Sequence, residues 1–367
     1  MARFDIASVD ANFMGADPSV GTDIKFYNVK DEPFSIYGLY DPKNQNVFKR
    51  LPDEIGMNVN SGVSYLYLNT AGGRVRFSTD SDCVILRVSF SALTNFAHMP
   101  RLGVAGFDLY LDDSNTGKQS FYGSFIPPSG ELEDSYERVI KFSDRRTRYL
   151  TLNMPLYNNV DELYLGFCKD ATIGEGLTYR NERPVVFYGS SITQGGCASR
   201  PGNCYEAIIS RRFDLDYLNL GFSGSGKAED IIVEYMSKLP MSVFVSDYDH
   251  NAPDPEYLRN THYRMYERIR GENPTLPYVM VSRPDFLKPK ESGLRDSYAR
   301  RQIIKESYEK ALATGDENVY FVDGESFFLL AGDLRDSCTV DGCHPNDLGM
   351  ACMARIIGDV IKKILDL

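Results

Sequence analysis

The sequence changes character near residue 175, and this change limits the folds that the chain can adopt. Before it, short β-type runs with alternating or aromatic patterning are separated by turn-forming clusters such as 70–73, 112–117 and 127–130. We expect strands over 24–27, 64–68, 75–78, 84–90, 107–111, 120–126, 148–152 and 162–167. Many short strands joined by turns are typical of an antiparallel β-sandwich. Residues 1–175 are therefore predicted to form a jelly-roll-like sandwich domain.

From residue 176 onward, apolar runs alternate with amphipathic helical stretches. The apolar runs are continuous, which is typical of parallel strands covered on both faces; they span 185–188, 217–220, 243–245, 278–281 and 319–322. The expected helices span 205–212, 228–238, 255–270, 297–313 and 346–365. This pattern predicts a doubly wound α/β domain with a five-stranded parallel sheet over residues 176–367. Reactive groups in such sheets gather at the carboxyl ends of the strands.

The charge and the cysteine pattern argue against a nucleic acid or membrane partner and favour the cytoplasm. The net charge of −11 at pH 7 repels phosphate backbones and anionic headgroups, so we expect neither a nucleic acid nor a membrane as partner. The first residues show no basic start followed by an apolar run, and the seven cysteines are odd in number and irregularly spaced. We expect ordinary thiols in a reducing cytoplasm. A secreted chain that had lost its signal would look the same, and the oligomeric state stays open.

Two short segments carry the candidate chemistry. Gly189-Ser190-Ser191 follows the apolar run 185–188, and Asp341-Gly-Cys-His344-Pro precedes the last helical stretch. A serine hydroxyl needs a base to become a nucleophile. Of the four histidines (His98, His250, His262 and His344), His344 is the only one with a carboxylate three residues before it and a proline after it. Together the segments predict a serine hydrolase.

Four segments in order resemble the sequence blocks of the SGNH, or GDSL-type, esterase and lipase superfamily. They are 189–193, 219–224, 247–251 and 341–344. In addition, Gly-Phe-Asp-Leu-Tyr at 106–110 resembles the signature of the GxDLY-type β-sandwich that precedes one branch of that superfamily. The resemblance covers nearly the whole chain. It implies a flavodoxin-like hydrolase domain and a serine esterase that acts on small acyl esters, with O-acetyl groups on a sugar as the favoured substrate.

The resemblance also implies roles for single residues. Ser191 would be the nucleophile, His344 the base that takes its proton, and Asp341 the group that orients the imidazole. The backbone N–H groups of Ser191 and Gly224 and the side-chain amide of Asn251 would form the oxyanion hole. No cofactor and no metal are implied.

The chain departs from the superfamily pattern at two places. The usual Gly-Asp-Ser reads Gly-Ser190-Ser191 here, which introduces a rival hydroxyl, and no glycine stands before Asn251 in the third block. The segment 196–202 follows the nucleophile and is predicted to border the pocket. Arg200, in this segment, is a candidate for binding a substrate oxygen, and His250, in the acidic segment 247–254, is a second candidate substrate-binding residue at the border of the pocket.

Three other interpretations remain at this stage, besides a lysophospholipase or a thioesterase of the same superfamily. The segment 221–227 has the spacing of a phosphate-binding loop up to Lys227, although Ala228 replaces the hydroxyl that would hold magnesium. A carbohydrate-binding module without catalysis is possible, although the chain has no tryptophan. A metal site could be drawn from either of two sets: Asp247, Asp249, His250 and Asp254, or Cys338, Cys343 and His344.

Overall fold

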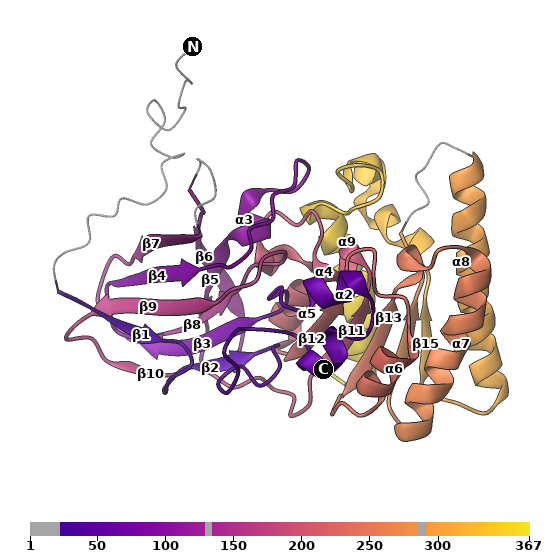
Figure 1. Cartoon of the computed structure of the whole chain (residues 1–367), viewed down its shortest axis with the longest axis horizontal. Helices are drawn as coiled ribbons and strands as arrows, with labels where there is room; N and C mark the ends of the chain where they lie inside the picture. The colour runs from indigo at the N-terminus through magenta and orange to yellow at the C-terminus, as the bar shows by residue number, and fades with distance from the viewer. Residues whose placement is uncertain (1–22, 129–133, 285–290) are drawn as a thin grey trace, which may run out of the picture.

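The computed structural model of the chain describes residues 23–128, 134–284 and 291–367, and it contains a β-sandwich followed by an α/β half (Figure 1). In the sandwich, one sheet has the strand order β1-β9-β4-β7. The other has the order β10-β3-β8-β5-β6, with β2 beside β3, and every pairing is antiparallel. The strands are β1 (Ile24–Asn28), β2 (Ser35–Tyr37), β3 (Arg74–Thr79), β4 (Cys83–Ser89), β5 (Phe107–Asp112), β6 (Gln119–Phe125), β7 (Ser135–Lys141), β8 (Arg148–Asn153), β9 (Glu162–Cys168) and β10 (Ile173–Glu175).

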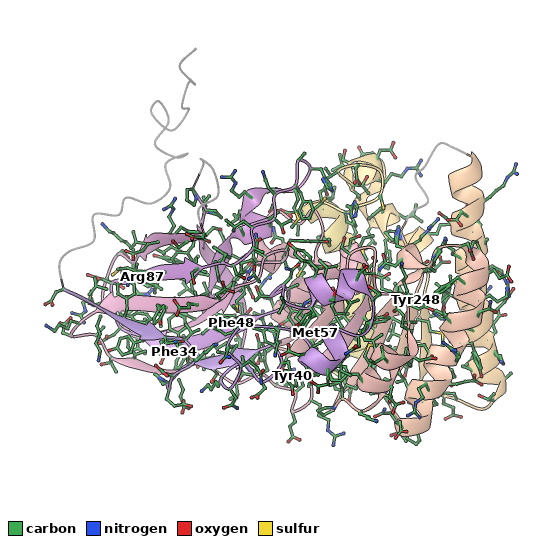
Figure 2. The ribbon with its side chains drawn as sticks, viewed as in Figure 1. Phe34, Tyr40, Phe48, Met57, Arg87 and Tyr248 are labelled. Atoms are coloured by element: carbon green, nitrogen blue, oxygen red, sulfur yellow. The ribbon has the colours of Figure 1, made fainter. Side chains whose placement is uncertain are left out.

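The core of the sandwich comes from the inward-facing side chains of both sheets. Phe77 and Leu150 come from one sheet and Leu86 and Leu165 from the other, and all four are fully buried in one cluster. Phe34, labelled in Figure 2, belongs to the same cluster and packs edge-on against Phe77 with ring centroids 5.6 Å apart. Alternate side chains of each strand point into this core, and the antiparallel sandwich that the sequence predicted is confirmed.

The predicted strand 64–68 is wrong, because residues 64–66 lie in the helix α2 (Ser61–Leu66) and residues 67 and 68 form the turn that follows it. Asn60 caps the helix by accepting hydrogen bonds from the N–H groups of Gly62 and Val63. The buried residues Val63, Leu66 and Tyr67 have helical spacing, which competes with the β propensity of the aromatic residues. α2 packs against the α/β half, where the Asn60 amide donates to the carbonyl of Ser225 at 2.9 Å (Figure 1).

The second half has the predicted doubly wound topology. Five parallel strands have the order β12-β11-β13-β14-β15, the order of flavodoxin-like folds. They are β11 (Val185–Gly189), β12 (Tyr217–Gly221), β13 (Val243–Asp247), β14 (Tyr278–Val281) and β15 (Val319–Val322). The main helices are α5 (Tyr205–Phe213), α6 (Asp230–Ser237), α7 (Pro255–Glu272), α8 (Glu291–Ala313) and α9 (Asp347–Ile364). The short helices are α1 (Asp53–Gly56), α3 (Arg101–Ala105), α4 (Ser191–Gln194), η3 (Pro201–Asn203), η4 (Asp249–Asn251), η5 (Gly324–Ser326) and η6 (Phe328–Ser337).

Helices cover both faces of the parallel sheet, which explains its continuous apolar strands. Side chains of α5 and α9 pack with Val185 and Phe187 on one face, while those of α6, α7 and α8 pack with Val186 and Tyr188 on the other. Within the described part of the chain, no helix is long and apolar enough to cross a membrane.

A buried arginine joins the two halves beside the end of β12. The guanidinium of Arg50 donates to the carbonyls of Gly221 at 2.6 Å, Leu66 at 2.7 Å and Asn69 at 2.9 Å. It also stacks over the ring of Phe222 at 4.5 Å from the centroid. Burial lowers the pKa of Arg50 to about 9, so the group still carries its charge at neutral pH. Arg50 therefore supplies hydrogen bonds to carbonyls that packing has removed from water.

We expect Arg50→Met to lower the free energy of unfolding by about 3 kcal/mol or more, because it leaves several buried carbonyls without a donor. Urea unfolding followed by circular dichroism measures the change. Arg87→Met is the matched control, because Arg87, labelled in Figure 2, is half-exposed and forms an ion pair with Glu137 at the surface. Equal losses for the two variants would contradict a special role of Arg50.

Candidate active site

Ser191 lies at a sharp turn between the end of β11 and the helix α4, of which it is the first residue. The turn requires Gly189, because a Cβ atom there would lie 2.0 Å from Thr193 Oγ1 and 2.4 Å from the carbonyl oxygen of Asp247. Ser190, the rival hydroxyl, is fully buried, and its Oγ accepts a hydrogen bond from the N–H of Ile192. Ser190 is thus the N-cap of α4, whereas Ser191 is partly accessible.

The structure brings Ser191, His344 and Asp341 together in one chain of hydrogen bonds. Ser191 Oγ lies 3.0 Å from His344 Nε2, and His344 Nδ1 lies 2.7 Å from Asp341 Oδ2. The other carboxylate oxygen, Oδ1, accepts from the backbone N–H groups of His344 at 2.8 Å and Cys343 at 3.0 Å. The loop 341–344 therefore holds the carboxylate and the imidazole in register without help from the rest of the fold.

The same contacts keep Asp341 ionised. Partial burial opposes the charge, but the backbone N–H of His344, its ring and the N–H of Cys343 together lower the pKa of Asp341 to about 2. A carboxylate that is charged at neutral pH can stabilise an imidazolium next to it.

Besides Ser191, the residues predicted for the oxyanion hole are Gly224 and Asn251, which lie after β12 and β13, the two strands that flank β11. Gly224 has a φ of 64°, which favours glycine, and no atom lies within 4 Å of the place where a Cβ would stand. Asn251 ends the short helix η4, and its Nδ2 donates to the carbonyl of Phe222 at 2.9 Å. The side chain of Asn251 thus braces the loop that carries Gly224, and its amide has a second N–H.

Both halves of the chain line a cavity of about 190 Å³ beside His344. The lining residues of the α/β half are Gly196, Cys197, Ser223 and His344, and those of the sandwich half are Phe96, His98, Met99 and Tyr157. Tyr157 also donates its hydroxyl to the carbonyl of Ser191 at 3.1 Å. A second cavity, of about 200 Å³, shares Phe96, Tyr157 and Ser223 with the first. Sequence reasoning missed all four sandwich residues, which carry no motif.

The two predicted substrate-binding residues have other neighbours. Arg200 lies 3.3 Å from the buried Asp108 and over the ring of Phe121, and it is not among the residues that line either cavity. A substrate contact of Arg200 thus has no support in its surroundings. His250 lies nearer the site, with its Nδ1 3.9 Å from Cys343 Sγ.

Asp108 shows what the segment 106–110 contributes to the site. Its carboxylate is fully buried and accepts from the N–H of Gly202 at 2.9 Å and from the Asn153 amide at 2.9 Å. Burial raises the pKa of Asp108, although these donors and nearby arginines oppose the shift. The motif therefore fixes the segment that follows Ser191 onto the sandwich.

The phosphate-binding interpretation of 221–227 is wrong. Helix α6 begins only at Asp230 and is preceded by Glu229, so two carboxylates stand where a phosphate would need a positive helix end. Gly226 instead packs against the end of β11, since a Cβ there would lie 2.5 Å from the carbonyl oxygen of Gly189. Gly221 and Gly226 therefore serve close packing beside Ser191, whereas the place of a Cβ at Gly224 is open.

The two metal sets drawn from the sequence do not assemble in the described part of the chain. Asp254 is the N-cap of α7, whereas Asp247 and Asp249 are buried at the end of β13. Cys338 is fully buried, and it does not form a ligand group with Cys343 and His344. Among the described residues, His344 instead shares a potential ligand group with His98 and Cys197.

Comparison with protein families agrees with this geometry. The model of the GDSL-like lipase/acylhydrolase family matches residues 182–362, and the model described as the N-terminus of SGNH-hydrolase-type esterases (GxDLY) matches residues 24–173. The chain belongs to the GDSL-like lipase/acylhydrolase family. As a member of this family it is an ester hydrolase. No curated protein sequence matches it.

Solved structures with the same fold include relatives of this GDSL-like chain. A putative GDSL-like lipase from Bacteroides ovatus is 27% identical, with a TM-score of 0.84 over 94% of this chain and 98% of that one. The salicylyl-acyltransferase SsfX3 from a tetracycline biosynthetic pathway is 17% identical, with a TM-score of 0.74 over 93% and 98%. A family two carbohydrate esterase from Clostridium thermocellum, in complex with cellohexaose, is 15% identical, with a TM-score of 0.61 over 91% and 99%.

The two adjacent serines give a direct test of the nucleophile. We expect Ser191→Ala to abolish hydrolysis of p-nitrophenyl acetate, because it removes the hydroxyl that lies beside His344. Ser190→Ala should keep much of the activity and lower the free energy of unfolding by about 1 kcal/mol, because it removes only a helix cap. Steady-state kinetics and urea unfolding measure the two effects. The reverse pattern would move the nucleophile by one residue.

Proposed function

We propose that this chain is a serine esterase that removes small acyl groups, and O-acetyl groups in particular, from a carbohydrate. The observation that carries the proposal is the unbroken hydrogen-bonded chain from Ser191 Oγ through His344 to Asp341. Nucleophile, base and orienting carboxylate at these distances are the arrangement that acyl transfer to serine requires.

The reaction has two steps. In the first, His344 Nε2 takes the proton of Ser191 as Oγ attacks the ester carbonyl, and the imidazolium then gives that proton to the departing alcohol. This leaves an acyl group on Ser191. In the second, His344 takes a proton from a water molecule that attacks the acyl carbon, and it returns the proton to Oγ as the acid leaves. Asp341 keeps Nδ1 protonated and stabilises the imidazolium in both steps.

Each step passes through a tetrahedral oxyanion, which needs donors that are already in place. The backbone N–H groups of Ser191 and Gly224 and the second N–H of the Asn251 amide supply them. The open space at Gly224 and the hydrogen bond that fixes Asn251 to Phe222 support this assignment. Each such donor contributes about 3 kcal/mol to the stability of the transition state.

The small volume of the cavities supports an ester with a small acyl group. The cavities measure about 190 Å³ and 200 Å³, below the roughly 300–1,000 Å³ typical of sites for drug-sized ligands. Phe96 and Tyr157 belong to the walls of both and limit the length of a bound acyl chain. The net charge of −11 suits a neutral sugar better than a phospholipid. A carbohydrate as the alcohol is also suggested by the carbohydrate esterase that shares this fold.

Substitution of Asp341 tests the mechanism, because one variant can remove the charge of the carboxylate while it keeps the structure of the loop. In Asp341→Asn, the amide oxygen can still accept the N–H bonds of Cys343 and His344, so the loop should keep its conformation while the charge is lost. We expect kcat/KM to fall on the order of 10²–10⁴-fold with little change in stability. Asp341→Ala should lose activity and also loosen the loop, which hydrogen exchange at the His344 amide would detect. An Asn variant with wild-type kinetics would contradict the role of the charge.

The cavity wall gives a test of acyl size. We expect kcat/KM for p-nitrophenyl esters to fall from acetate to butyrate to octanoate, and Phe96→Ala to flatten this series because it lengthens the space for the chain. One methylene in a packed pocket changes binding by about 1–3 kcal/mol. Phe121→Ala is the matched control, since Phe121 is exposed on β6 and lines neither cavity. A wild-type preference for octanoate would favour a lysophospholipase or a thioesterase instead.

The experiment that tests the whole proposal is labelling with a fluorophosphonate followed by peptide mass mapping. The label should appear on the peptide with Ser191 and disappear in Ser191→Ala. Acetate release from a panel of acetylated sugars then identifies the alcohol. A protein that binds these sugars but takes no label and releases no acetate would be the non-catalytic module.

A further inference from the structure

Three potential metal ligands from separate segments converge beside Ser191. His98 comes from the loop between β4 and α3, Cys197 follows α4, and His344 precedes α9. One ligand atom of each lies within 4.8 Å of those of the other two, and the two imidazole centroids are 5.7 Å apart. We propose that His98, Cys197 and His344 bind a thiophilic divalent transition-metal ion such as zinc, and that this ion inhibits the esterase.

The donor set fits such an ion. Two imidazoles and one thiolate suit zinc in sites that keep a fourth position open. Thiolate and imidazole select zinc, copper or cadmium, whereas magnesium and calcium prefer oxygen donors. Ligand atoms of tetrahedral zinc lie on the order of 3.5 Å apart, so this group has to contract by about 1 Å. His98 is exposed in a loop while Cys197 is buried, so the ring of His98 is the ligand that moves.

Cys197 has no role in the proposed ester hydrolysis. Burial, helped by the charges of Asp341 and Cys343, raises the pKa of its thiol to about 12, so at neutral pH it is protonated and not a nucleophile. Its Sγ lies 3.6 Å from the carbonyl oxygen of His98, so the weak S–H donor already points to the loop that supplies the second ligand. A bound dication takes the place of the thiol proton, as it does at cysteine ligands in general.

Inhibition follows from the position of His344. Nε2 faces Ser191 Oγ and Nδ1 faces Asp341, so coordination through either ring nitrogen breaks one of the two hydrogen bonds that the mechanism needs. The ion also occupies space in the cavity that His98, Cys197 and His344 line. The inhibitory effect rests on the proposed function, whereas binding of the ion does not.

Metal binding is measured first, on the full chain after treatment with a chelator. Zinc is titrated against a competing fluorescent indicator, and cadmium is followed by its thiolate charge-transfer absorption. Cys197→Ser should abolish the absorption band. Cys197→Ser and His98→Gln should each weaken zinc binding by more than the roughly 10–100-fold that loss of an outer-shell partner costs.

Cys343→Ser and His250→Gln are matched controls, because Cys343 lies in the loop 341–344, His250 contacts it, and both are outside the ligand group. They should keep the cadmium band. Zinc binding that survives Cys197→Ser, or a band that Cys343→Ser removes, would overturn the site. If Cys197→Ser fails to fold, the zinc affinity of His98→Gln tests the site instead. His98 is an exposed loop residue, so its side chain is not needed for the core.

Inhibition is measured second, with p-nitrophenyl acetate and with each variant compared with its own metal-free rate. Zinc should inhibit the wild-type protein, a chelator should restore the rate, and magnesium should have no effect. Zinc that binds through Cys197 without slowing hydrolysis would overturn the inhibitory claim. A protein without serine-dependent hydrolysis that still shows the Cys197-dependent cadmium band would instead remove the proposed function and leave the metal site standing.

Discussion

The four-residue helix α4, which carries Ser191, depends on contacts from both halves of the chain. A helix this short has no stability of its own, because it is little longer than its nucleus. Gln194 at its end supplies much of the support: its Nε2 donates to the Asn69 side chain and to the Leu156 carbonyl, each at 3.1 Å, and its Oε1 accepts from the N–H of Ser223 at 3.0 Å. A single buried side chain thus connects the turn at Ser191, the sandwich half and the Gly224 loop.

A buried carboxyl group, that of Asp247, supports the same turn. Asp247 ends β13 next to Gly189, and burial raises the pKa of its carboxyl well above the ordinary value, with Asp249 adding to the shift. Its Oδ2 lies 3.3 Å from Thr193 Oγ1 and 3.4 Å from the Tyr205 hydroxyl. Asp247 therefore holds the turn through hydrogen bonds, and burial disfavours its charged form.

The sequence predicted most of the strands and the segments that meet at the site, for reasons that are local. Continuous apolar runs mark the strands of a sheet covered on both faces, and the loop 341–344 makes its own hydrogen bonds, so its spacing alone is informative. The failure at 64–68 has the opposite cause: Asn60 starts a helix there that is buried against the other half of the chain, and a short aromatic run does not reveal that contact.

The cavity could not be predicted, because its walls depend on how the two halves pack. Phe96, His98 and Met99 lie in a loop of the sandwich half, and they acquire a role only where that loop meets Cys197 and His344. The Asp108 carboxylate could be found as part of a motif, but its function in fixing Gly202 is visible only across the interface.

Because the two halves supply different parts of the site, substrate specificity can change without any change in the groups proposed for catalysis. The hydrogen-bonded groups proposed for catalysis lie on the α/β half, where strand ends and short turns fix them to within narrow limits. Much of the cavity wall comes from a loop of the sandwich, whose backbone is not part of either sheet. Substitutions in that loop can therefore reshape the substrate site while the distances among Ser191, His344 and Asp341 stay the same. On this argument the sandwich is a structural part of the active site and not an appendage to it.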